Sequence, residues 1–161
     1  MAAIKDILLS VQERLGELVP ELAYIDKDWG QLAYEKPAVR YPCALLDIEA
    51  ITYTQEGGVT QMADGAISVR IANQRLTPAS YLAPNREQAY EIIDLVDKVH
   101  KALHRFAPPG YSPLFRTALR KEYGDSSKEC YLITYQVAFE EGFDMGNTGK
   151  VEGAKVKINL R

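Results

Sequence analysis

The sequence has few of the residues that carry chemistry in enzymes. It contains only two cysteines and two histidines among 161 residues. No G-x-S-x-G motif occurs, and Gly57-Gly58 is not followed by the Lys-Ser/Thr of a phosphate-binding loop. Cys43 and Cys130 stand in apolar, strand-like runs, where thiols are rarely activated. We therefore expect no enzyme and no cofactor, and we expect two buried free thiols, with a disulfide between them as the alternative.

Long apolar runs and an excess of one charge are also missing. No stretch reaches the roughly eighteen consecutive apolar residues of a membrane span, so we expect none. The net charge of -3 argues against a broad nucleic-acid-binding surface. Charged residues interrupt the apolar pattern of the first turns, unlike in a signal peptide. The composition is that of one folded domain made in a cytoplasm.

The two histidines form the one arrangement that suggests a metal. His100 and His104 lie one helical turn apart, a spacing that can place two imidazoles on one ion. The zinc-protease motif needs a glutamate directly after the first histidine, and Lys101 stands there. We predict a structural role and no metal site, and a metal-dependent enzyme that uses this pair remains the alternative. The acidic pair Asp47 and Glu49 alternates with apolar residues, which is typical of the solvent side of a strand.

Hydrophobic periodicity predicts two helices. The first, over residues 4–18, has one apolar stripe and is stopped by Pro20. The second, over residues 86–106, begins after Asn85, with Gln88 as its capping-box partner. Its predicted buried stripe consists of Ala89, Ile92, Ile93, Val96, Val99, Leu103 and Phe106.

Alternating apolar residues predict the strands. The longest patterns cover residues 43–54, 66–73, 114–123 and 131–139, and a short one covers residues 22–25. The first two form an antiparallel hairpin, in which the glycine-containing segment Gln55–Gly65 is predicted to be a long mobile tip. The order of these elements predicts an α+β fold.

Tyrosine and the last residues of the chain suggest interaction surfaces. Aromatic residues concentrate at interfaces, so we predict that tyrosines in loops contact other subunits: Tyr34, Tyr81 and Tyr111. Residues 1–141 form one predicted domain, and residues 142–161 form a flexible, basic arm. Its part from residue 150 onward has four basic residues against one acidic residue, a net charge of +3. Its apolar residues alternate in a pattern that suits pairing with a sheet edge, although disorder is the alternative: Val156, Ile158 and Leu160.

Three segments resemble a known family. They are the opening helix, the strand over residues 66–73 that leads through Pro84-Asn85-Arg86 into the second helix, and the closing strand that reads YLITYQVAFEE. Together they resemble the tail terminator and tail-completion proteins of long-tailed bacteriophages, over roughly residues 1–141. The resemblance implies a mainly antiparallel sheet with two helices packed on one face.

The resemblance also implies a structural function. Such proteins form rings, often hexamers, that cap the tail tube and join it to the head connector. The chain would then be a homo-oligomer with tail-tube and head-connector proteins as partners, located in the bacterial host cytoplasm during assembly and in the virion afterwards. A prophage source is equally implied. A small cytoplasmic protein-binding module of unrelated role is the main alternative.

Overall fold

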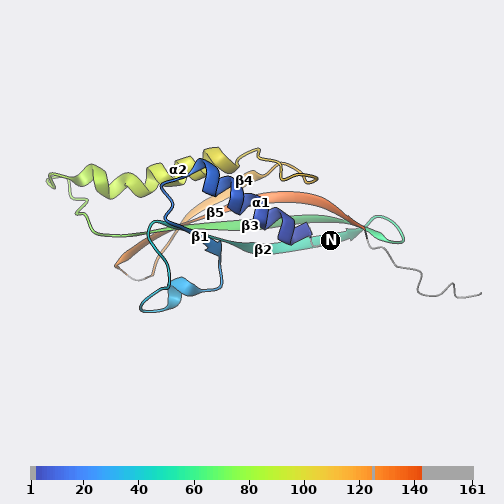
Figure 1. Ribbon diagram of the computed structural model, residues 1–161, viewed down its shortest axis with the longest axis horizontal. Helices are drawn as coiled ribbons and strands as arrows, with labels where there is room; N and C mark the ends of the chain where they lie inside the picture. The colour runs from blue at the N-terminus through green and yellow to red at the C-terminus, as the bar shows by residue number, and fades with distance from the viewer. Residues whose placement is uncertain (1–2, 125, 143–161) are drawn as a thin grey trace, which may run out of the picture.

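The computed structural model describes residues 3–124 and 126–142, and it has an α+β fold (Figure 1). Two α-helices lie beside each other on one face of a five-stranded sheet. The predicted fold class is therefore confirmed. The elements, with two short 3-10 helices η1 and η2, are α1 (Ala3–Leu18), β1 (Tyr24–Lys27), η1 (Gln31–Ala33), β2 (Cys43–Gln55), β3 (Thr60–Gln74), η2 (Arg86–Tyr90), α2 (Glu91–Leu103), β4 (Phe115–Glu122) and β5 (Lys128–Gly142).

The sheet has the order β1-β2-β3-β5-β4. Only β1 and β2 are parallel, and the other three pairs are antiparallel. Alternate residues of the central strands point towards the helices, as the period of a strand requires. The main core joins these residues to the helix stripes; its fully buried members include Val11, Leu15, Val69, Ile71, Val99, Leu103, Ile133 and Tyr135.

The predicted long tip of the first hairpin is wrong. Strands β2 and β3 pair as far as Gln55 opposite Gln61, so only residues 56–59 connect them. Ala63 is buried in this extension, where it pairs with Phe139 of β5. The polar residues around Ala63 in the sequence gave no sign of this burial. Gly65 lies inside β3, where a Cβ atom would come within 2.7 Å of the Ile51 Cγ1 atom. Glycine serves close approach here, and not a turn.

A β-bulge changes which residues of β2 face the helices. Ile48 pairs with Ile67, but the next paired residue is Ala50, opposite Ala66. The extra residue, Glu49, moves Ala50 off the core face. Ile51 packs on the core in its place, so the strict alternation through Ala50 that the sequence suggests ends at Ile48.

The second helix begins differently from the prediction. Asn85 makes no side-chain capping hydrogen bond, and residues 86–90 form the 3-10 helix η2 before α2 starts. The predicted capping box is therefore wrong. Ile93 is 43% exposed, whereas Leu95 and Ala102, which the stripe omitted, are buried. The α2 face that meets the sheet is thus turned away from Ile93.

A second, smaller cluster lies on the other face of the sheet. Cys43, Leu45 and Ala72 are buried there beneath the segment that connects β1 to β2. Gln31 holds this segment from within: its side chain accepts a hydrogen bond from the Trp29 N–H (2.9 Å) and donates one to the Lys27 carbonyl (3.0 Å). Gln31 is fully buried with both ends satisfied, which removes the cost of burying an amide.

An ion-pair network ties this segment to the sheet. The Arg70 guanidinium on β3 pairs with Asp28 in the connecting segment and with Glu122 at the end of β4. Its two hydrogen bonds to the Glu122 carboxylate, from Nε (2.6 Å) and from the second terminal nitrogen (3.1 Å), form a bidentate contact. Hydrogen bonding to Arg70 lowers the pKa of Glu122.

Strand β5 ends at Gly142, close to the boundary predicted for the domain. The predicted basic arm and its residues Val156, Ile158 and Leu160 lie outside the described residues. Within the described ranges, neither helix has the length and apolar character needed to cross a membrane.

The Gly65→Ala substitution tests the close approach of β3 to β2. Because the new Cβ atom would meet Ile51 and lie 3.2 Å from the Ala50 carbonyl oxygen, we expect the free energy of unfolding to fall by about 1–3 kcal/mol. Denaturant titration measures it. Gly57→Ala, with no atom within 4 Å of the new carbon, is the control. Combining Gly65→Ala with Ile51→Ala should recover part of the loss, and simple additivity of the two changes would contradict this packing.

The Arg70–Glu122 pair predicts a dependence of stability on pH. A carboxyl group whose folded pKa is lowered adds stability above its unfolded pKa, and this stability is lost as the pH falls through the folded pKa. We expect Glu122→Gln to reduce the free energy of unfolding by about 1 kcal/mol at neutral pH. The difference from the unmodified protein should shrink below about pH 4.5. An equal difference at pH 7 and pH 3 would contradict the assignment.

Candidate functional site

The histidine pair is built into the contact between α2 and the sheet. The rings of His100 and His104 lie 4.7 Å apart between centroids. The Nδ1 atom of His100 lies 3.4 Å from the Tyr135 hydroxyl, and that of His104 accepts a hydrogen bond from the Arg116 N–H (3.3 Å). Burial, followed by the charges of Arg116 and His104, lowers the pKa of His100. In the described ranges no three His, Cys, Asp or Glu side chains come together as metal ligands.

The two cysteines share one face of the sheet without meeting. Cys43 and Cys130 are both register partners of Ala72, from opposite sides. Two strand spacings therefore separate them, about 10 Å, which is too far for a disulfide. Burial raises the pKa of Cys43 to about 12 and also raises the pKa of Cys130. Both are free thiols, as predicted, although Cys130 is only half-buried, and neither is poised as a nucleophile.

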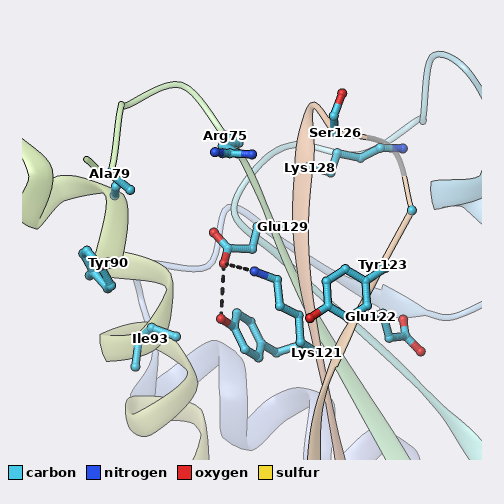
Figure 2. Close-up of a pocket in the computed structure, with 13 residues that line it drawn as sticks. Arg75, Ala79, Tyr90, Ile93, Lys121, Glu122, Tyr123, Ser126, Lys128 and Glu129 are labelled. Carbon is cyan, nitrogen blue, oxygen red and sulfur yellow. Dashed lines mark hydrogen bonds and ion pairs between the residues drawn. The ribbon is translucent and has the colours of Figure 1, made fainter. Parts of the chain in front are cut away.

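One hollow of the surface lies where the turn between β4 and β5 meets the start of α2. It has a volume of about 550 Å³, and Figure 2 shows the residues that line it. Arg75, Ala79, Tyr90 and Ile93 approach it from α2 and the chain before it, and the strands supply the opposite wall. Tyr90 is 57% exposed, so this wall is aromatic and open to solvent.

The strand wall of this hollow is held by a small polar network. The Glu129 carboxylate accepts hydrogen bonds from the Lys121 ammonium (2.9 Å) and from the Tyr131 hydroxyl (3.2 Å) (Figure 2). The Glu129 hydrogen bond raises the pKa of Lys121, and burial, followed by the Glu129 charge, raises that of Tyr131. At neutral pH, Lys121 therefore stays positively charged and Tyr131 stays neutral. The network therefore fixes the shape of the wall.

A second hollow of about 480 Å³ lies on the other face of the sheet and shares the same turn. Tyr34 and Leu32 line it from the β1–β2 connection, with the Arg70 network in its floor. Tyr123 lines both hollows and is 91% exposed, so it forms the ridge between them.

Strand β4 continues this surface along the edge of the sheet. Every residue from Phe115 to Lys121 is exposed, on both faces of the strand. Phe115 and Leu119 are each 47% exposed, and basic side chains stand between and beside them. We call Tyr90, Ile93, Phe115, Leu119 and Tyr123 the β4 surface. Aromatic, aliphatic and arginine side chains in this mixture are typical of protein interfaces.

The three predicted interface tyrosines lie in different surroundings. Tyr34 is 62% exposed and packs at 6.0 Å from Trp29 between ring centroids. Tyr81 is 81% exposed, with the Arg86 guanidinium 4.8 Å from its ring centroid. Tyr111 is half-buried instead. The Tyr111 hydroxyl donates to Asp6 (3.1 Å) and its ring packs edge-on against Phe139, so this side chain helps to join α1 to the sheet.

Sequence reasoning missed the β4 surface itself. The pattern of residues 114–123 predicts a strand correctly, but alternation cannot reveal that neither face is covered. Ile93 was assigned to the core because it continues a helical stripe. Tyr123, the last residue of this predicted strand, was the one sequence feature that could have indicated an interaction surface there. The strongest strand pattern in the sequence lies elsewhere, at residues 131–139.

No protein-family model matches the sequence. No curated protein sequence matches it either. Among solved structures, the fold is similar to that of a chain from the virion of a native gene transfer agent particle, with 12% sequence identity and a TM-score of 0.48, over 88% of this chain and 100% of that chain.

Proposed function

We propose that this protein is a structural assembly protein of a phage-like virion. In this proposal it acts as a tail terminator or tail-completion protein: copies form a ring that caps the tail tube and meets the head connector. The observation that carries the proposal is the uncovered strand β4, with exposed apolar side chains on and around it. Contiguous exposed apolar groups of this kind mark protein contacts.

A closed ring needs two different surfaces on each copy, because the contact between neighbours is head-to-tail. The β4 surface supplies one of them at one edge of the sheet. Tyr34, which lines a hollow together with Tyr123, and Tyr81, in the loop before η2, stay predicted interface residues and are both exposed. The element order and the Pro84-Asn85-Arg86 sequence that leads through η2 into α2, which carry the resemblance, support the tail-terminator version.

The metal-enzyme alternative has less support. Each histidine of the pair already has a partner in the sheet: Tyr135 of β5 for His100, and the Arg116 N–H of β4 for His104. No third metal ligand lies with them among the described residues. We propose that the protein is not an enzyme. A protein-binding module of unrelated role would use the same β4 surface. Self-assembly into rings distinguishes the tail-terminator proposal from this alternative.

Leu119→Asp tests the β4 surface as an assembly contact. We expect the unmodified protein to form rings, alone or with the tail-tube protein of the same genome. The charged side chain should weaken assembly by about tenfold or more, because an aspartate would be buried unpaired in the contact. Light-scattering mass and electron microscopy give the readout, and circular dichroism verifies the fold.

Leu18→Asp is the matched control, since Leu18 is 49% exposed at the end of α1 and Leu119 is 47% exposed. This variant should assemble normally. Equal behaviour of both variants would contradict a role of β4. An unmodified protein that neither self-associates nor binds the tube would remove the proposed function.

A further inference from the structure

Strand β2 has an open outer edge along more than half of its length. Strand β1 pairs only with residues 43–46 of β2, and the Asp28 N–H then donates to the Leu46 carbonyl (2.7 Å). No strand in the described part of the chain pairs with this edge from Asp47 to Gln55. Unpaired strand edges are templates for a further strand.

The sheet face beside this edge is acidic. Asp47, Glu49, Asp64 and Glu140 lie on the side away from the helices. The Glu49 carboxylate reaches Thr134 (3.1 Å) and the Asp64 carboxylate reaches Gln136 (2.8 Å), and Glu140 follows buried Phe139. Lys27 pairs with Asp47 (3.0 Å), which leaves most of this negative charge uncompensated. We call these four acidic residues the acidic row.

The opposite side of the same edge is apolar. A groove of about 330 Å³ runs between α1 and the end of β1, lined by Ile4, Leu8, Leu9 and Leu46 with the stems of nearby polar side chains. Leu9 is 46% exposed in it. A strand added to β2 would therefore have the apolar groove on one of its faces and the acidic row on the other.

We infer that residues 155–161 of a second copy of this chain pair with the open edge of β2. Their apolar residues, Val156, Ile158 and Leu160, would face the groove beside α1. Their basic residues, Lys155, Lys157 and Arg161, would face the acidic row. Strand period and charge match the two sides of the edge together. This inference rests on the proposed self-assembly and names its second contact.

Chain direction favours a neighbouring copy as the acceptor. Strand β5 reaches Gly142 opposite Thr60, at the end of the sheet beside the β2–β3 connection (Figure 1). Strand β5 runs in the same direction as β2, so the chain that follows Gly142 would have to reverse to pair with the β2 edge of its own copy. Residues 143–154 span up to about 40 Å when extended, enough to reach the edge of an adjacent copy.

Two complementary variants of the full chain test the pairing. Lys155→Glu with Lys157→Glu reverses the charge of the donor and leaves the acceptor edge intact. Asp47→Lys with Glu49→Lys reverses the acceptor and leaves the donor intact. Each variant alone should self-associate about tenfold or more weakly than the unmodified protein. Combining all four substitutions in one chain should restore association. Lys36→Glu with Arg40→Glu, an equal charge change on exposed residues elsewhere, should leave association unchanged.

Hydrogen exchange at the amides of residues 48–54 that point to the open edge locates the contact, because the other amides of this segment already pair with β3. These open-edge amides should exchange more slowly as the concentration of the unmodified protein rises, and this protection should disappear in the donor variant. Association that is unaffected by any charge reversal would overturn the inference and leave the proposed function standing. Protection that does not depend on concentration would show pairing within one copy and would also overturn it. A protein that never associates, with these open-edge amides unprotected at every concentration, removes the inference along with self-assembly in isolation, while binding to the tail tube still tests the proposed function.

Discussion

Burial of one face of β3 and β5 beneath α1 and α2 is the interaction on which the rest of the structure depends. Val69 and Ile71 on β3 meet Ile133 and Tyr135 on β5, and all four are fully buried against the helix stripes. These strands are long, and two helices cover only part of the sheet (Figure 1). Within the described ranges, residues 115–121 of β4 stay exposed, and the part of β2 after Leu46 has no strand paired to its outer edge. The same arrangement that makes the core therefore leaves the two edges that the proposals use.

The other face of the sheet is organised by charge and hydrogen bonds more than by apolar area. Buried Gln31 satisfies its amide within the β1–β2 connection, and Arg70 pairs with Asp28 and Glu122 from two different segments. These contacts bring the connection over the small cluster around Cys43. They also fix the floor of the hollow beneath Tyr34, so a polar network positions part of the candidate interaction surface.

The histidines and both cysteines, the residues most able to suggest catalysis, are placed by packing: the histidine rings contact the sheet and each other, and the pKa of each thiol is raised by burial. The features of the surface that suggest a function are its exposed apolar side chains on and around β4. An assembly function uses these features directly, since binding depends on complementary surfaces and not on a reactive group.

The sequence by itself determined the α+β class, the presence of both helices and all five strands, and the ends of α1, β2 and β4 to within one residue, because amphipathic periodicity reflects which side of an element is buried. It also determined that Asp47 and Glu49 face solvent. Tertiary structure decided the rest. Residues 60–65 became strand because β5 pairs with them, and Ile93 became exposed because α2 turned its other side to the sheet. Which edges stay open depends on how many residues of β1 pair with β2 and on what covers β4. No local pattern contains that information, since it arises only when distant segments pack together.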